Sequence, residues 1–320
     1  MPILIHKYVR IYYTISMNDP LLLLEKCVLC PRECGVNRFN GEKGFCGIGN
    51  EIIVAHYGAH FGEETPISGT RGSGTIFFAS CNLRCIYCQN HQISHGRSGE
   101  SVTVQGLVEI FFLLKQQGCH NINLVSPVPY IPFIALAIEQ AIKEGIEIPF
   151  IYNTNAYEHV HALRALDGLI NIYLPDFKYW SASIAEKLSH VPRDKGYPEH
   201  AKQAISEMKR QTGDLVIEDG IAKTGILIRH LVLPANLSGS RHIIEWIKEH
   251  LGTGTFISLM SQYYPLYKAA SYRILNRKIR YDEYNELVMF LSDNGFENVF
   301  IQELESAPLF VPDFRKEKPF

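Results

Sequence analysis

The sequence lacks three features that would each point to a particular class of protein. Its 31 Lys and Arg residues nearly balance its 33 Asp and Glu residues, so no positive excess marks it for nucleic acid or an anionic membrane surface. It contains no run of about 20 apolar residues, which excludes a membrane-spanning helix. It also lacks internal repeats and low-complexity tracts. With 46% hydrophobic residues in 320, the chain can bury a large core and is predicted to be globular.

A secretory signal is also missing at the N-terminus. The short apolar run at 21–24 leads into Glu25 and Lys26 instead of a small-residue cleavage site. We therefore expect a cytoplasmic, reducing location, where clustered cysteines indicate metal binding or catalysis and not disulfides. Met17 is an alternative start, which would make residues 1–16 a dispensable extension.

Downstream of residue 74, short β-branched or aromatic runs alternate with segments of helical periodicity. Apolar residues recur at helical spacing, for example over 131–142 and 281–291. This alternation predicts βα units around a parallel sheet, and six units favour an open partial barrel over a closed eight-unit one. Functional residues should lie at the carboxyl ends of the strands, which are expected at residues 75–79, 121–125, 148–153, 169–174, 226–233 and 255–259.

Three regions follow from this pattern. Residues 1–73 form an N-terminal extension with a Cys-rich, loop-rich module, and residues 74–265 form the barrel. Residues 266–320 supply a C-terminal helix, a further strand and a tail that pack on the barrel. Glu63 and Glu64 are expected in an exposed loop, with a place at the substrate opening as the alternative.

Cysteine is scarce, but seven of the eight lie within the segment 27–88. Cys81-Asn-Leu-Arg-Cys85-Ile-Tyr-Cys88 directly follows the first predicted barrel strand. Three thiolates on one loop can hold three irons of a [4Fe–4S] cluster and leave the fourth iron open to a substrate or cofactor. A zinc site completed by His91 or His95 and a set of buried, non-ligating thiols are the weaker alternatives.

A second group of cysteines precedes the barrel. Cys27, Cys30, Cys34 and Cys46 could close a metal site completely, which suits structural zinc or an auxiliary Fe–S cluster. The spacing does not decide between these metals. The remaining alternative is that the four cysteines are free buried thiols. Cys119 stands alone and is expected in the core.

These motifs resemble the radical S-adenosylmethionine (radical SAM) superfamily, whose signature is Cys-x3-Cys-x-aromatic-Cys, with Tyr87 as the aromatic residue. Cys85-Ile-Tyr-Cys-Gln-Asn90 is similar to the glycyl-radical-enzyme activases. The whole chain looks most like uncharacterised homologues of pyruvate formate-lyase activating enzyme, through its Cys-rich N-terminus, His60-Phe-Gly-Glu-Glu64 and Tyr173-Leu-Pro-Asp-Phe-Lys178. The resemblance implies a partial (β/α)6 barrel with a [4Fe–4S] cluster on Cys81, Cys85 and Cys88, and S-adenosylmethionine (SAM) bound at the open iron.

The resemblance also assigns cofactor contacts to the strand ends. Asp176 and Lys178 match the activases' Asp-x-Lys, whose Lys contacts the SAM carboxylate; the alternative is a salt bridge at the barrel rim. Arg229 matches an arginine that reaches the cofactor, or else pairs with an acid. The Gly-Gly-Glu-like stretch of the family is absent, and Asn153 stands where the activases have Asp. The expected SAM-contacting residues are Tyr87, Ser126, Asn153, Thr154, Asp176, Lys178, Arg229 and Gln262.

The implied function is reductive cleavage of SAM to a 5′-deoxyadenosyl radical that abstracts hydrogen from a substrate, an oxidoreductase-type chemistry. The substrate could be a partner protein, as in the activases. Electrons would come from a low-potential donor such as flavodoxin or ferredoxin. Radical modification of a peptide or small metabolite is one alternative. A non-catalytic Fe–S electron-transfer or metal-binding scaffold is another, and the incomplete ligand set at Cys81, Cys85 and Cys88 counts against it.

Overall fold

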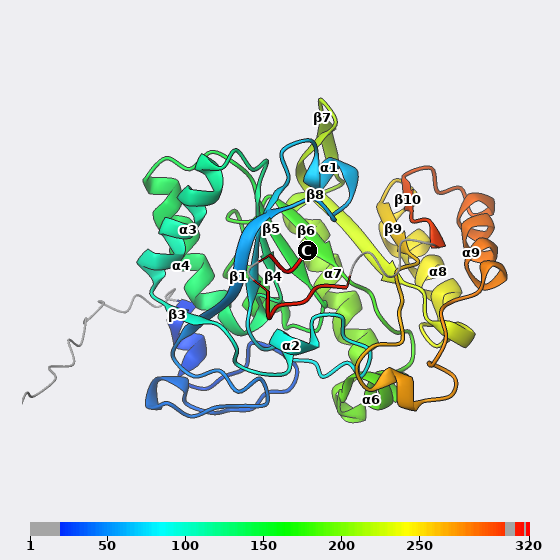
Figure 1. The fold of residues 1–320 in the computed structure, drawn as a ribbon, viewed down its shortest axis with the longest axis horizontal. Coiled ribbons are helices and arrows are strands. Elements are labelled where there is room, and N and C mark those ends of the chain that lie inside the picture. The colour runs from blue at the N-terminus through cyan, green and yellow to red at the C-terminus, as the bar shows by residue number, and fades with distance from the viewer. Residues whose placement is uncertain (1–19, 305–310, 317) are drawn as a thin grey trace, which may run out of the picture.

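A large open sheet forms the centre of the molecule (Figure 1). The computed structural model describes residues 20–304, 311–316 and 318–320, so the alternative start at Met17 and the segment 1–16 lie outside the described residues. Seven parallel strands lie side by side in chain order: β2 (Ser73–Phe78), β4 (Ile122–Val125), β5 (Phe150–Thr154), β6 (Ile172–Pro175), β8 (Ile221–Leu231), β9 (Phe256–Met260) and β10 (Val299–Ile301). The parallel α/β architecture expected from the sequence is confirmed.

Antiparallel strands extend the sheet beyond β2. β1 (Ile52–His60) pairs with β2, and β3 (Glu100–Val102) pairs with β1. Over the described part of the chain, β3 and β10 are the two edges of this path and do not pair with each other. The sheet is therefore open, as the predicted partial barrel requires. β7 (Val216–Glu218) pairs antiparallel with β8 to one side of this path.

Strand β1 lies in the segment that we expected to be loop-rich. Its first three residues, Ile52, Ile53 and Val54, are buried, whereas the remaining six are half-buried or exposed. A buried run of three residues is too short to indicate a strand by periodicity. Backbone pairing with β2 holds the rest of the strand in place, which only the tertiary structure shows.

Helices connect the parallel strands and pack against them. Thr103 Oγ1 accepts a hydrogen bond from the N–H of Gly106 (3.0 Å) and so caps α3, and Pro132 lies in the first turn of α4. Figure 1 shows α3 and α4 together at one end of the sheet and α8 and α9 at the other. The helices are α1 (Thr65–Ser68), α2 (His91–Ser94), α3 (Val104–Gln116), α4 (Ile131–Lys143), α5 (Val160–Arg164), α6 (Ala182–Ser189), α7 (Tyr197–Thr212), α8 (Ser240–Leu251) and α9 (Tyr281–Asp293), with 3-10 turns at Pro20–Leu24, Arg38–Asn40, Val128–Tyr130, Arg193–Lys195, Pro234–Asn236 and Ala269–Ser271.

The central strands are buried on both faces. Every residue of β2, β4, β5 and β6 is buried, as expected for parallel strands covered by helices. A charged side chain at the end of such a strand therefore lies next to apolar residues and needs a partner or a ligand. None of the described helices combines the length and the apolar character needed to cross a membrane.

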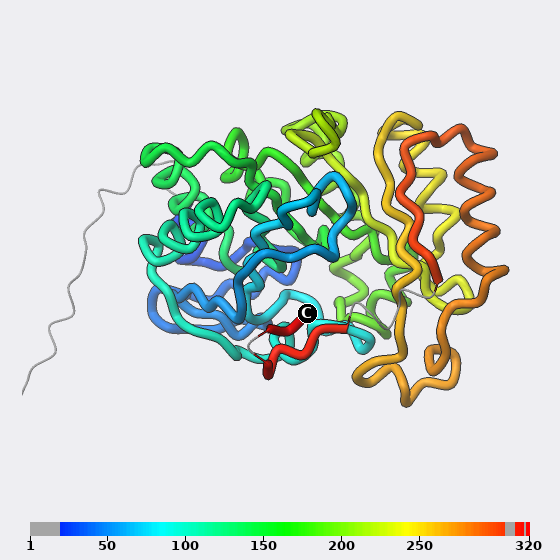
Figure 2. The backbone as a smooth tube through the Cα atoms, turned by 45° about the horizontal axis from the view of Figure 1, so that its top comes forward, coloured from blue at the N-terminus to red at the C-terminus, as the bar shows by residue number. Residues whose placement is uncertain are grey.

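The C-terminal segment crosses the open side of the sheet, next to β1 (Figures 1 and 2). The Phe320 ring lies 4.2 Å from the His60 ring, and the Phe314 ring lies 5.2 Å from the Phe77 ring, measured between centroids. Gln92 of α2 accepts a hydrogen bond from the Phe314 N–H (2.7 Å). These contacts place the chain end at the mouth of the cavity described below.

Candidate active site

A cavity of about 440 Å³ opens at the carboxyl ends of the parallel strands. The strand-end rule predicted this position, because loops that follow parallel strands meet at one edge of the sheet. All the residues predicted to hold the cluster or SAM line this one cavity: Cys81, Cys85, Tyr87, Cys88, Ser126, Asn153, Thr154, Asp176, Lys178, Arg229 and Gln262. They come from the ends of six different strands, so the fold brings together what the sequence separates.

The loop after β2 carries the three thiols, and each sulfur has a hydrogen-bond partner. Cys81 Sγ accepts hydrogen bonds from the Leu83 N–H (3.4 Å) and from Asn155 Nδ2 (3.3 Å). Cys85 Sγ lies 2.9 Å from Ser189 Oγ. Cys88 Sγ lies 3.2 Å from the Ser94 hydroxyl. Polar groups of this kind stabilise thiolates bound to a metal centre.

The donor set fits an Fe–S cluster. Burial raises the pKa of the Cys88 thiol to about 12 and also raises that of Cys85, so these groups need a metal to become thiolates at neutral pH. Within the part of the chain that the structure describes, no three Cys, His, Asp or Glu side chains are grouped around one ion position. A cluster does not require such convergence, since each thiolate binds a different iron.

Tyr87 belongs to a chain of hydroxyl groups that reaches Cys85. The Tyr87 hydroxyl hydrogen-bonds with the Tyr179 hydroxyl, which lies 2.6 Å from Ser189 Oγ, and Ser189 contacts Cys85 Sγ. The Tyr87 ring also packs edge-on against Tyr263. Tyr87 thus lines the cavity and at the same time supports the loop. The sequence did not point to Ser189, because it lies about a hundred positions away at the end of α6.

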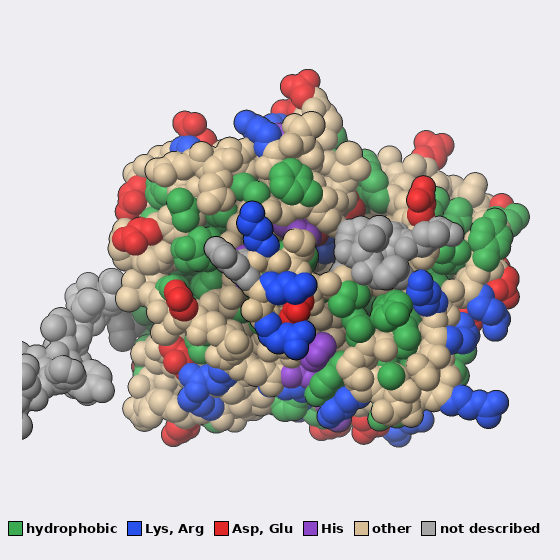
Figure 3. All heavy atoms as spheres, viewed as in Figure 1, with side chains coloured by type: hydrophobic (Ala, Val, Ile, Leu, Met, Phe, Trp, Pro, Cys, Tyr) green, Lys and Arg blue, Asp and Glu red, His purple; other side chains and the backbone are tan. Residues whose placement is uncertain are grey.

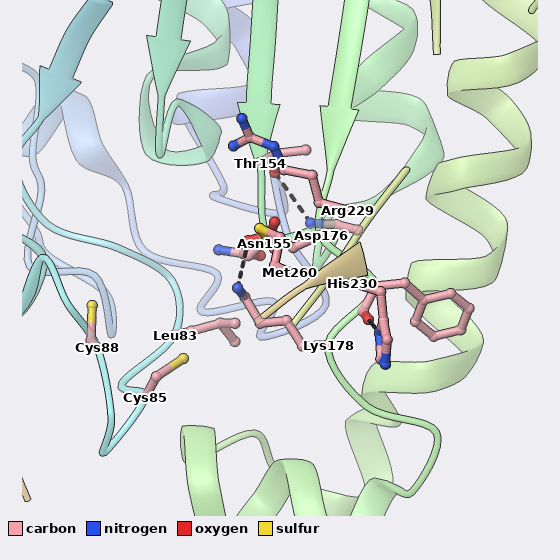
Figure 4. Close-up of polar contacts among 12 residues, drawn as sticks. Leu83, Cys85, Cys88, Thr154, Asn155, Asp176, Lys178, Arg229, His230 and Met260 are labelled. Atoms are coloured by element: carbon pink, nitrogen blue, oxygen red, sulfur yellow. Dashed lines mark hydrogen bonds and ion pairs between the residues drawn. The ribbon is translucent and has the colours of Figure 1, made fainter. Parts of the chain in front are cut away.

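Asp176 and Lys178 form an ion pair beside the cysteine loop (Figure 4). Lys178 Nζ lies 2.5 Å from Asp176 Oδ2, and both side chains are largely buried. Burial alone would lower the pKa of Lys178, but Asp176 and Cys85 outweigh it and the pKa is raised. The ammonium group therefore keeps its charge at neutral pH. The rim salt bridge that we considered as an alternative is present, and the pair also faces the cavity.

Arg229 projects into the cavity from β8 and pairs with two acids. Its Nε and Nη2 donate to the two carboxylate oxygens of Glu64 at 3.0 and 2.7 Å, and Nη2 also donates to Glu63. The expectation of an exposed loop for these acids is wrong, because their side chains are only 9% and 7% exposed. A buried guanidinium group needs a negatively charged partner. The position of Arg229 in an apolar strand therefore indicated an acidic partner, but the sequence did not identify which acid it is.

The remaining predicted contacts are polar groups at the ends of β4, β5 and β9. Thr154 Oγ1 donates to the buried Glu158 carboxylate (2.6 Å), which also accepts from the Tyr152 hydroxyl. The Ser126 N–H donates to the Asn153 carbonyl (3.1 Å). The backbone carbonyl of Gln262 accepts a hydrogen bond from the Gln89 side chain, and the side-chain oxygen of Gln262 accepts one from the Gln302 side chain.

Lys and Arg side chains gather near the centre of the face that bears the C-terminal segment, while most acidic side chains lie toward its margins (Figure 3). Aromatic side chains line the cavity at this side, among them Phe77, Tyr264 and Phe320. The mouth therefore offers both apolar and basic surface to an approaching molecule.

The four N-terminal cysteines do not join this cavity. Cys27, Cys30, Cys34 and Cys46 line a separate void of about 20 Å³. Asn82 borders that void and follows directly on Cys81, so the two thiol groups flank the same loop.

Comparison with known proteins shows which family this chain resembles. Residues 75–221 match the family model described as "Radical SAM superfamily". The uncharacterized protein MJ0674 of Methanocaldococcus jannaschii is 30% identical over 270 residues, covering 82% of this chain and 72% of that protein. The FeFe-hydrogenase maturase HydG of Carboxydothermus hydrogenoformans has a TM-score of 0.49 and 14% identity over 72% of this chain, which spans about half (54%) of that structure.

A domain of pyruvate-formate lyase-activating enzyme from Bacteroides vulgatus has a TM-score of 0.40 and 12% identity, over 55% of this chain and 94% of that domain. The family match runs from β2 to the first residue of β8. It thus includes Cys81 and Lys178 but neither the four N-terminal cysteines nor Arg229.

Proposed function

Because the chain belongs to the radical SAM superfamily, we propose that its cavity binds SAM beside a [4Fe–4S] cluster held by Cys81, Cys85 and Cys88, and abstracts hydrogen from a peptide segment of a partner protein. When bound, the cluster and SAM supply a one-electron cleavage that yields a 5′-deoxyadenosyl radical. The observation that carries the proposal is the single cavity in which three thiols, a charged lysine and several amide groups meet.

In this proposal Lys178 binds the carboxylate of SAM. Its ammonium group remains charged, and Asp176 fixes its position at 2.5 Å while neutralising only part of its field. A second carboxylate can therefore bind through a charge-assisted hydrogen bond. The amide side chains of Asn153 and Gln262 supply neutral donors and acceptors for the remaining polar groups of SAM.

The size of the cavity favours a substrate presented from outside. Pockets of roughly 300–1,000 Å³ hold one drug-sized ligand, and this cavity measures about 440 Å³. With SAM in place, little room remains for a second free molecule, so the reacting group would enter through the mouth. A peptide segment can do this. The similarity of Cys85-Ile-Tyr-Cys-Gln-Asn90 to the activases supports the same choice.

The substrate class can be tested by following the abstracted atom. Cells of the source organism grown in deuterated medium provide an extract, which dialysis separates into macromolecules and small molecules. Reconstituted protein, SAM and dithionite are added to each fraction, and deuterium in 5′-deoxyadenosine is measured by mass spectrometry. We expect deuterium transfer from the macromolecular fraction. Transfer from the small-molecule fraction alone would refute the peptide proposal and favour a metabolite.

Two variants control this experiment. Cys85→Ala should transfer no deuterium, and Cys119→Ala should transfer as much as the unmodified protein because Cys119 lies in the core away from the cavity. In the cell we expect electrons to come from a low-potential flavodoxin or ferredoxin in place of dithionite.

A further inference from the structure

The four N-terminal cysteines are drawn together by the local backbone. The Cys27 N–H donates to the Val36 carbonyl (2.9 Å), and the Gly35 N–H donates to the Cys27 carbonyl (3.0 Å). Gly44 lies against Cys34 so closely that a Cβ at position 44 would be 2.7 Å from its Sγ. The chain therefore approaches Cys34 in a way that only glycine permits. All four cysteines line the same void.

One of these sulfurs accepts a hydrogen bond from a backbone N–H group. The Phe45 N–H donates to Cys34 Sγ at 3.4 Å. Such N–H···S bonds stabilise thiolates in metal sites, where they orient the ligand and offset its negative charge.

A buried arginine at this void has an unpaired nitrogen. Arg38 is only 1% exposed and lines the void together with the four cysteines. Its Nε donates to the Gly49 carbonyl (2.9 Å) and its Nη1 to the Pro129 carbonyl (2.7 Å), whereas Nη2 has no hydrogen-bond partner among the described residues. A buried cationic donor without an acceptor is costly, and such a group indicates an anionic neighbour that belongs at the site.

We propose that Cys27, Cys30, Cys34 and Cys46 bind one structural Zn²⁺ ion as four thiolates. On binding, the four thiols release four protons, and the resulting zinc tetrathiolate carries a charge of −2. The guanidinium groups of Arg32 and Arg38, which both border the void, balance this charge. Because no three such side chains among the described residues surround one ion position as they stand, binding must turn them inward.

The size of the void, as it stands before the side chains turn inward, favours a single ion. About 20 Å³ holds roughly one water-sized body. Zn²⁺ fits this space, whereas four irons with four bridging sulfides need considerably more. The sequence alone left zinc and an Fe–S cluster open, and the void favours zinc.

The zinc site would also stabilise the loop that carries Cys81. Arg32 Nε donates to the Asn82 carbonyl (2.6 Å), and Arg32 Nη2 donates to the His190 carbonyl (2.7 Å). Asn155 Nδ2 donates to Asn82 Oδ1 (2.8 Å) and also to Cys81 Sγ. Arg32, which lies between Cys30 and Cys34 in the chain, thus connects the N-terminal cysteines to the residue after Cys81 by a direct hydrogen bond. This role rests on the proposed radical SAM site, whereas the zinc site itself does not.

The test removes the other thiol group first. The full chain carrying Cys81→Ala, Cys85→Ala and Cys88→Ala is produced with both zinc and iron supplied, and its metals and acid-labile sulfide are measured. We expect one zinc per chain, with neither iron nor sulfide. Bound iron with sulfide, or a purified folded chain without metal, would overturn the proposal. Neither result depends on SAM cleavage, so failure here is distinguishable from failure of the proposed function.

Single replacements locate the ligands. In the same background, Cys30→Ser and Cys46→Ser should each lose the zinc, and Cys119→Ser should keep it. If the ligand variants do not fold, cobalt substitution of the triple variant gives a second readout. Tetrahedral Co²⁺ with four thiolates has intense visible bands and a sulfur-to-metal charge-transfer band. A cobalt spectrum without thiolate character would contradict the four-cysteine assignment.

Discussion

The buried carboxyl group of Glu158 gives a quantitative prediction. It is only 1% exposed and accepts hydrogen bonds from the Tyr152 hydroxyl and from Thr154 Oγ1, both at 2.6 Å. Burial raises its pKa from 4.5 to about 7, although the two hydroxyl donors act in the opposite direction. Glu158 therefore holds the end of β5, where Thr154 lines the cavity.

The raised pKa of Glu158 determines in which direction the free energy of unfolding changes with pH. The folded state holds this proton more tightly than the unfolded state, so the stabilisation is fully present below pH 4.5 and is lost as the pH rises through about 7. One pKa unit corresponds to about 1.4 kcal/mol. The difference between 4.5 and about 7 therefore lowers the free energy of unfolding by roughly 3 kcal/mol across this range.

Glu158→Gln should remove this pH dependence, because glutamine has nearly the same shape and does not titrate. Urea unfolding at several pH values gives the free energy of unfolding of each variant. We expect the difference between the unmodified protein and Glu158→Gln to change by roughly 3 kcal/mol from pH 4.5 to above 7. Other titrating groups cancel in this difference.

Glu109 provides the matched control, because it is an exposed glutamate on α3. Glu109→Gln should leave the pH dependence unchanged. If Glu158→Gln retained the pH dependence of the unmodified protein, the assignment of this titration to the buried carboxyl group would be refuted.

Three further predictions concern the cavity. Lys178→Met should weaken SAM binding roughly 10- to 100-fold, the value of one charge-assisted hydrogen bond, and an unchanged dissociation constant in equilibrium binding would contradict the carboxylate contact. Ser189→Ala removes the hydroxyl beside Cys85 Sγ, so it should lower the cluster's reduction potential in an EPR-monitored titration while iron content stays the same; an unmoved potential would count against this contact. Phe320→Ala should cost less than about 1 kcal/mol, since the side chain is 54% exposed. It should nevertheless speed bleaching of the cluster by oxygen because the ring packs against His60 at the mouth, and equal bleaching rates would argue against that shielding.

The sequence could predict the fold from local patterns, and the same patterns together with the family resemblance picked out residues that the structure brings to one cavity. Buried apolar runs indicated the parallel strands, and the strand-end rule placed residues such as Asp176 and Arg229 at one edge of the sheet. Charges directly after buried runs were the clearest signal, since such positions need a partner or a ligand.

The sequence could not identify partners that come from distant elements. Glu63 and Glu64 lie more than 160 positions from Arg229, and their burial depends on how β1 folds back on β2. Ser189 contacts Cys85 only because α6 ends beside the cysteine loop. No periodicity or motif encodes these contacts, so they require the tertiary structure.

The proposed cleavage of SAM at a cluster held by Cys81, Cys85 and Cys88 can be measured directly. Its most direct measurement uses anaerobically reconstituted protein with SAM and dithionite, and quantifies methionine and 5′-deoxyadenosine. We expect equal amounts of both products from the unmodified protein and from Cys119→Ala, and none from Cys85→Ala. Absence of cleavage in the unmodified protein, with no spectral change on adding SAM, or cleavage that survives in Cys85→Ala, would contradict it.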